Sequence, residues 1–134
     1  MFTFTSSVRV RYGETDRMGY VYYGNYATYL EVARVEALRS LGCNYRAMEE
    51  GGVMMPVLQS NVHYLKPAFY DEELSIVTTV PEMPSARIRF EYEIFNEHRV
   101  LIAQAQTVLA FIDRKTGRPC RLPSALKNSL SAFF

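Results

Sequence analysis

The spacing of apolar residues changes once along this chain, and that change limits what the chain can fold into. From Tyr26 to Leu41 apolar residues recur every three or four positions, which predicts one amphipathic helix of about four turns. Gly24 and Asn25 supply a start, with Asn25 as the N-cap, and Gly42 supplies a stop. Beyond residue 56 the period is two, which is typical of strands with one buried face. This order argues against the strand-helix alternation that builds a parallel sheet.

The remaining elements follow from the same patterns. The strands are expected at Phe4–Arg11, Val57–Leu65, Glu73–Val80, Ile88–Ile94 and Val100–Ile112, and short helices at Tyr45–Glu50 and Ser124–Phe134. The long helix has to be covered by the other strands, and Phe90, Tyr92 and the 108–112 segment are candidates for the concave face. The fold class is therefore α+β: a long central helix wrapped by a curved antiparallel sheet of about five strands. One domain is expected over residues 1–134.

Composition excludes several classes of protein. Fifteen Lys and Arg against fourteen Asp and Glu give a formal charge of +1, which argues against a nucleic-acid-coating protein or a polybasic membrane protein. No apolar run approaches the ~20 residues of a membrane helix, and the N-terminus lacks the pattern of a signal peptide. Cys43 and Cys120 have no metal-ligand spacing and are typical of reduced thiols. We expect a cytoplasmic protein with no metal site.

Tyrosine is unusually concentrated in one part of the chain. Six of the ten tyrosines fall in a single short stretch: Tyr12, Tyr20, Tyr22, Tyr23, Tyr26 and Tyr29. A buried tyrosine needs a partner for its hydroxyl, so this cluster indicates either a pocket or interface, or an aromatic core that happens to be rich in tyrosine.

Asp16 lies inside this stretch, between the first strand and the start of the long helix. The first N–H groups of a helix have no partner within it, so they can hold an oxyanion or polarise a carbonyl. A carboxylate beside such groups can act as a nucleophile or as a general base on water. A loop Asp is also often only a turn or capping residue.

Residues 12–34, YGETDRMGYVYYGNYATYLEVAR, closely resemble the opening motif of hotdog-fold acyl-CoA thioesterases of the 4-hydroxybenzoyl-CoA thioesterase type. Residues 63–68, HYLKPA, resemble the family's second strand and its exit turn. The resemblance implies that Asp16 is the catalytic carboxylate and that the Tyr23 amide, with Gly24 beside it, polarises the thioester carbonyl. It also implies that Asn25 and Tyr26 shape the acyl pocket. Many bacterial members have His where this chain has Tyr23, so a mechanism needing an imidazole there is not supported.

Several other residues have competing interpretations. Tyr20 and Tyr22, with Met18, suggest a bulky pocket lining for an aromatic or medium-chain acyl group. For the CoA phosphates, basic residues near strand ends are candidates, with Ser85 and Arg87 preferred and Lys66 a further choice. Glu31 on the helix is expected to pair with a basic neighbour rather than to act in catalysis. His63 and His98 are expected in a polar interface and a solvated turn.

The resemblance implies hydrolysis of acyl-CoA to a carboxylic acid and CoA without a cofactor, by a homodimer or homotetramer. Two alternatives stay open: a thioesterase acting on acyl-carrier protein, and a non-catalytic acyl-binding protein of the same fold. A hydratase would need a His acting with a carboxylate, and no His lies near the loop and helix start. Neither a nucleic acid nor a membrane is expected as a partner.

Overall fold

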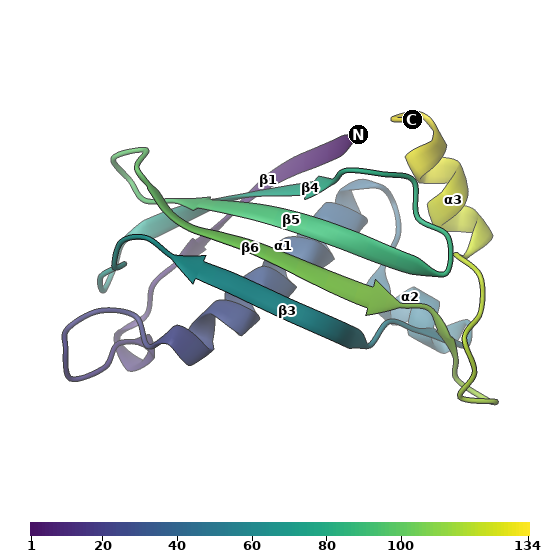
Figure 1. Cartoon of the computed structure of the whole chain (residues 1–134), viewed down its shortest axis with the longest axis horizontal. Helices are drawn as coiled ribbons and strands as arrows, with labels where there is room; N and C mark the ends of the chain where they lie inside the picture. The colour runs from purple at the N-terminus through teal and green to yellow at the C-terminus, as the bar shows by residue number, and fades with distance from the viewer.

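The computed structural model describes all 134 residues, and its main layer is a sheet that curves around one long helix (Figure 1). The helices are α1 (Tyr26–Ser40), α2 (Tyr45–Glu50) and α3 (Ser124–Ser131), with short 3-10 turns η1 (Tyr12–Glu14) and η2 (Tyr23–Asn25) before α1. The strands are β1 (Phe2–Arg9), β2 (Val53–Met54), β3 (Val57–Tyr64), β4 (Glu73–Val80), β5 (Arg87–Phe95), β6 (Leu101–Ala110) and β7 (Ile112–Asp113).

Five of the strands form one antiparallel sheet in the order β1-β4-β5-β6-β3. The α1 helix connects β1 to β3 on the opposite edge by crossing behind the sheet, as Figure 1 shows. Strand β3 pairs only with β6, so its other side is a free edge eight residues long. The two chain ends meet beside α3, where the Met1 ammonium donates to the Phe133 carbonyl at 2.7 Å.

The core lies between α1 and the concave face of the sheet. Cross-strand pairs such as Ile88 with Leu109 and Ile94 with Ala103 put alternate residues of β5 and β6 on that face. The buried face of α1 consists of Tyr26, Tyr29, Leu30, Ala33, Arg34, Ala37 and Leu38. All of these except Arg34 belong, with their neighbours, to one cluster of 25 buried hydrophobic side chains. Full burial of a large apolar side chain stabilises the fold by about 1.5–3 kcal/mol, so this cluster is the main source of stability.

The predicted α+β fold with a long helix and a five-stranded antiparallel sheet is confirmed, and the corrections concern element ends. The first strand runs over Phe2–Arg9 rather than Phe4–Arg11, because the regular pairing with β4 ends at Arg9. Val10 still exchanges backbone hydrogen bonds with Asp71 and Glu72, and Arg11 leads into η1. The final helix ends at Ser131, three residues early. The predicted strand to Ile112 divides at Phe111, and its last part pairs as β7 with β2, a two-stranded sheet that the sequence did not predict.

Asn25 is not the side-chain cap that was predicted for the long helix. It has helical backbone angles (φ −75°, ψ −18°) within η2, and its side chain makes no capping hydrogen bond. Its amide donates instead to the Glu14 carbonyl at 2.8 Å. The stop at Gly42 is confirmed, because this glycine has φ +78°, a left-handed conformation that favours glycine.

None of the helices is both long and apolar enough to cross a membrane. No three His, Cys, Asp or Glu side chains come together in a group that could hold a metal ion.

Candidate active site

The loop that carries Asp16 is held as a small antiparallel ladder. Tyr22 N–H donates to the Glu14 carbonyl at 2.9 Å, Thr15 bridges Val21, and Asp16 N–H donates to the Tyr20 carbonyl at 2.9 Å. The Val21 N–H donates to the Ala68 carbonyl, also at 2.9 Å, which fastens the ladder to the segment after β3. The ladder therefore fixes where Asp16 stands relative to the start of α1.

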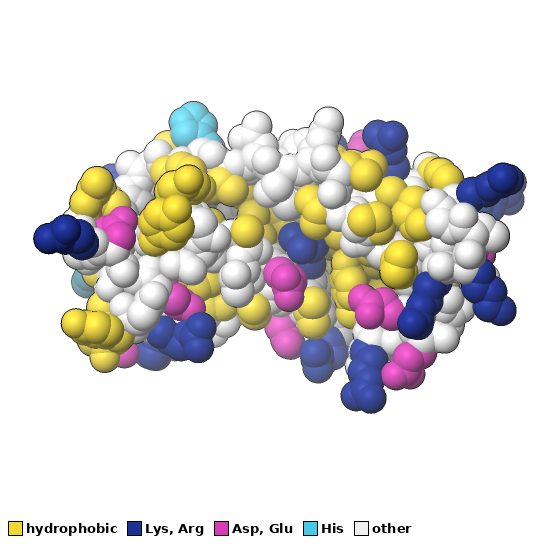
Figure 2. Space-filling model, turned by 90° about the horizontal axis from the view of Figure 1, so that it is seen from below, with side chains coloured by type: hydrophobic (Ala, Val, Ile, Leu, Met, Phe, Trp, Pro, Cys, Tyr) yellow, Lys and Arg dark blue, Asp and Glu magenta, His cyan; other side chains and the backbone are white.

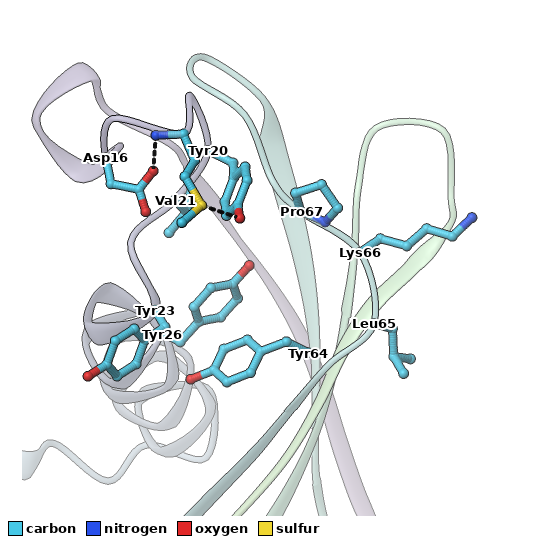
Figure 3. A pocket seen from close by; sticks show the side chains of 10 residues that line it. Asp16, Tyr20, Val21, Tyr23, Tyr26, Tyr64, Leu65, Lys66 and Pro67 are labelled. Carbon is cyan, nitrogen blue, oxygen red and sulfur yellow. Dashed lines mark hydrogen bonds between the residues drawn. The ribbon is translucent and has the colours of Figure 1, made fainter.

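The Asp16 side chain has one occupied and one free carboxylate oxygen. Oδ1 accepts the Met18 N–H at 2.8 Å, and Oδ2 accepts no hydrogen bond within the chain. The residue is half-buried at the edge of a cavity of about 440 Å³ (Figure 3). This cavity is lined by Asp16, Met18, Tyr20, Val21, Tyr23, Tyr26, Tyr64, Leu65, Lys66 and Pro67. A partly shielded carboxylate with a free oxygen is suited to attack a bound electrophile or to take a proton from water.

The backbone at Tyr23 and Gly24 offers donors beside this cavity. Both residues lie in η2, directly before α1, and their N–H groups donate to no acceptor within the chain. They also stand at the positive end of the α1 dipole. A Cβ at Gly24 would lie 2.7 Å from the ring of Tyr22, so a larger residue would require this exposed ring to move. The arrangement can therefore receive a developing negative charge on a carbonyl oxygen.

Tyrosine rings form the apolar part of the cavity. Tyr26, in the first turn of α1, meets Tyr64 at the end of β3 edge to face, with ring centroids 5.1 Å apart. Figure 3 shows the rings of Tyr23, Tyr26 and Tyr64 gathered on one side of the cavity. Burial, followed by the neighbouring Tyr64 and Glu72, raises the pKa of Tyr26 to about 12. Its hydroxyl is therefore a neutral hydrogen-bonding group at physiological pH.

The structure brings some of the predicted site residues together and separates others. Asp16, Tyr20, Tyr23, Tyr26 and Lys66 all line the cavity, although the Lys66 side chain extends away from the rings in Figure 3. Tyr22, Gly24 and Asn25 lie next to the cavity without lining it. The Tyr22 ring packs against Tyr23, with centroids 4.8 Å apart.

Ser85 and Arg87 lie at the opposite end of the sheet from Asp16. Arg87 begins β5, and its cross-strand partner is Ala110, whereas the cavity lies at the end of β3. A strand of this length separates the two ends by roughly 25 Å. Figure 2 shows more Lys and Arg side chains toward the right-hand end of the molecule than toward the left, whereas hydrophobic side chains occur along the whole face. Ser85 and Arg87 therefore do not line the Asp16 cavity of their own chain, and a single chain does not bring all the predicted site residues together.

Tyr64, in the cavity lining, and Glu14, in the loop beside it, are among the residues that were not selected from the sequence. Tyr64 could have been found, because it alternates with Val62 on the inward face of its strand, directly before Lys66-Pro67. Glu14 could not, because a carboxylate in a polar loop gives no sign that it will be buried. Glu31, in contrast, is exposed on α1 and forms no ion pair, so the predicted pairing with a basic neighbour is wrong.

The outer face of the sheet is polar where β3 and β6 meet. Gln59, Asn61, His63, Gln104 and Gln106 surround a shallow hollow there, on the side away from the cavity. His98 is exposed in the turn between β5 and β6, as expected.

A family model described as the thioesterase-like superfamily matches residues 10–130. The chain belongs to this superfamily. Among its relatives, the acyl-CoA thioester hydrolase YbgC of Escherichia coli is 31% identical over 119 residues, 89% of each chain. The 1,4-dihydroxy-2-naphthoyl-CoA hydrolase of Synechococcus elongatus is 26% identical over 90% of each chain.

Solved structures of thioesterases have the same fold as this chain. The DHNA-CoA thioesterase of Staphylococcus aureus has a TM-score of 0.91 and 38% identity, covering 99% of this chain and 89% of that one. A 4-hydroxybenzoyl CoA thioesterase, 20% identical with a TM-score of 0.86 over 96% of this chain and 99% of that one, shares the fold. The predicted hotdog fold and the resemblance to 4-hydroxybenzoyl-CoA-type thioesterases are confirmed.

Proposed function

We propose that this thioesterase-like protein hydrolyses acyl-CoA thioesters, with Asp16 as the catalytic carboxylate. The observation that carries the proposal is the free Oδ2 of Asp16 in the same cavity as Tyr23, whose backbone N–H has no acceptor. A carboxylate and a carbonyl-polarising donor are the two groups that thioester hydrolysis requires.

The reaction proceeds with the thioester carbonyl oxygen directed at the N–H groups of Tyr23 and Gly24. Either Asp16 Oδ2 attacks the carbonyl carbon, expelling the CoA thiolate and forming an anhydride that water then hydrolyses, or Oδ2 takes a proton from the attacking water. In both cases the C–S bond breaks, the thiolate gains a proton, and a carboxylic acid and free CoA result. The N–H groups stabilise the oxyanion as the carbonyl becomes tetrahedral.

The acyl group is accommodated by the tyrosine rings. Tyr26 and Tyr64 present edge-to-face aromatic surfaces beside the carboxylate, a lining that suits a flat ring better than a flexible chain. The naphthoyl group in the names of two similar hydrolases supports an aromatic acyl group. We therefore propose an aromatic acyl-CoA as the preferred substrate class.

A homodimer paired through β3 would complete the site. The Leu65 N–H donates to the Ile102 carbonyl at 2.9 Å. Because N–H groups alternate in direction along a strand, those of Asn61 and His63 also point toward β6. The N–H groups of Ser60 and Val62 therefore point toward the free edge. An exposed, regular edge of this length is a template for another strand. Antiparallel pairing of two β3 strands carries the partner subunit's Ser85 and the partner subunit's Arg87 toward the Asp16 cavity, where the CoA phosphates need cations.

The experiment is a free-thiol release assay of the purified protein with aromatic, medium-chain and long-chain acyl-CoAs, and with acyl-carrier protein carrying the same acyl groups. The proposal expects turnover of acyl-CoA, with the highest kcat/KM for an aromatic acyl group. Turnover confined to the carrier protein would favour the carrier-protein thioesterase, and binding without thiol release would favour the acyl-binding protein. A cytoplasmic location and a tetramer remain predictions from the sequence.

A further inference from the structure

Glu14 is the only carboxylate in the chain that is buried, with 9% of its surface exposed. Its Oε1 accepts the Tyr29 hydroxyl at 2.7 Å and the Arg11 backbone N–H at 2.8 Å, and its Oε2 accepts Arg11 Nε at 3.0 Å. All of this carboxylate's contacts come from Arg11, which directly precedes η1, and from Tyr29 near the start of α1. A buried charge is retained only when it is satisfied in this way.

The same residue also closes the loop that carries Asp16. Its carbonyl accepts the Tyr22 N–H at 2.9 Å and the Asn25 amide at 2.8 Å, the two residues on either side of Tyr23 and Gly24. Glu14 is therefore joined by its side chain to α1 and by its backbone to both sides of the oxyanion donors. Two residues further on, Asp16 continues the same ladder.

We propose that Glu14 and Tyr29 are positioning residues, which fix Asp16 relative to the Tyr23 and Gly24 N–H groups by holding the loop ladder against α1. This inference rests on the proposed function, because it takes Asp16 as the catalytic carboxylate. Neither Glu14 nor Tyr29 lines the cavity, so both act through the loop rather than on the substrate. Displacements of about 1 Å can change a rate a hundredfold, so a single hydrogen bond that sets this spacing has a large kinetic effect.

The charge state of Glu14 is compatible with this role. Burial raises the pKa of its carboxyl, but the hydrogen bonds from the Arg11 backbone, Tyr29 and the Arg11 side chain outweigh burial and lower the net pKa. The carboxylate is thus ionised at neutral pH, so both of its oxygens accept hydrogen bonds and neither carries a proton to donate. Tyr29 keeps its proton, because burial and the adjacent Glu14 raise its pKa.

The test compares two tyrosine hydroxyls on the same core. Tyr29→Phe removes the donor to Glu14 and keeps the ring packed against Tyr26. The matched control Tyr45→Phe removes a hydroxyl that donates to the Met55 carbonyl at 3.2 Å, far from the loop. For acyl-CoA hydrolysis, Tyr29→Phe should lower kcat about tenfold or more with KM changed less than about twofold. Tyr45→Phe should leave both unchanged while lowering Tm by a similar amount.

Equal kcat in Tyr29→Phe and Tyr45→Phe would overturn the proposal. If Tyr29→Phe does not fold, Glu14→Gln decides, since the amide keeps an acceptor for Tyr29 but sets an N–H donor against Arg11 Nε. A folded Glu14→Gln protein should have a kcat below that of the wild type with KM little changed, and wild-type kcat would contradict the proposal. Wild-type kcat in Asp16→Asn would instead overturn the proposed function, whereas an inactive Asp16→Asn beside a fully active Tyr29→Phe would overturn only the positioning role.

Discussion

At the end of the sheet where β3 finishes, tyrosine rings surround a carboxylate and the loop backbone is closed by hydrogen bonds. At the end where β5 begins, Arg89 pairs with Glu82 at 3.1 Å, but four exposed cations take part in none of the chain's ion pairs: Arg87, Arg118, Arg121 and Lys127. The first end has groups that can act on an acyl group. The second has charges that can bind phosphate but no group placed for hydrolysis.

In the proposed dimer, the cavity of one chain and the cations of its partner would together form one complete site. Neighbouring cations without anionic partners repel one another, and an anion that binds between them lowers their electrostatic energy. The free β3 edge offers a direct way to bring the two kinds of end together in a dimer.

Blocking the β3 edge should separate the two halves. Ser60→Pro removes an N–H that faces the free edge and leaves the ladder with β6 intact, a position where proline is tolerated. We expect a folded monomer, seen by light scattering, with thiol release reduced on the order of a hundredfold because the substrate loses half its positioning contacts. Ser60→Ala keeps the N–H and should remain a fully active dimer. A fully active Ser60→Pro monomer would show that one chain holds a complete site.

Removing a cation from the second end should weaken CoA binding without slowing the chemistry. Arg87→Ala is expected to raise KM about tenfold, the usual effect of losing one charge-assisted hydrogen bond, with little change in kcat. The dependence of KM on salt should also become shallower. Arg99→Asn removes an exposed cation from the other end at φ +61°, which suits Asn, and serves as the control. Equal KM values for the two variants would remove Arg87 from the proposed site.

The buried carboxylate of the first end should make stability depend on acidity. The folded-state pKa of Glu14 is lowered below its usual value, so its contribution is present above the unfolded-state value of about 4.3 and is lost as the pH falls through the folded-state value. Thermal melts of the wild type from pH 7 to pH 3 should lose a few degrees more than those of Glu14→Gln. Parallel melting curves for the two proteins would mean that Glu14 contributes no such linkage.

Much of the fold could be predicted because its signals are local. The apolar spacing from Tyr26 onward depends only on the helix itself, and the alternation around Phe90 and Tyr92 depends only on one strand. The two residues of β2 were not predicted, because two residues carry no period and their pairing with β7 depends on distant sequence. Asn25 was assigned to a cap because its residue type favours one, whereas a tertiary contact with Glu14 decides its role.

The part of the candidate site that could be predicted is the part formed by one continuous stretch of sequence. Asp16, Tyr23 and Tyr26 belong to one stretch of sequence and meet in one cavity. Tyr64 reaches that cavity from β3, a neighbour that the sequence of the loop does not indicate. Arg87 lies far from Asp16 because of the order and direction of the strands in the sheet, and the residue patterns of the sequence did not predict that order.

The most direct test of the account is the rate of acyl-CoA hydrolysis by Asp16→Asn measured beside Asp71→Asn. Asp71 is a second loop aspartate, exposed at φ +69°, which Asn adopts readily, and its ion pair with Arg9 is a surface contact of 3.8 Å. The account predicts that Asp16→Asn keeps the fold and loses about a thousandfold in kcat, since the carboxylate does the chemistry, while Asp71→Asn stays at the wild-type rate. A folded Asp16→Asn protein within about twofold of the wild-type kcat would contradict the account.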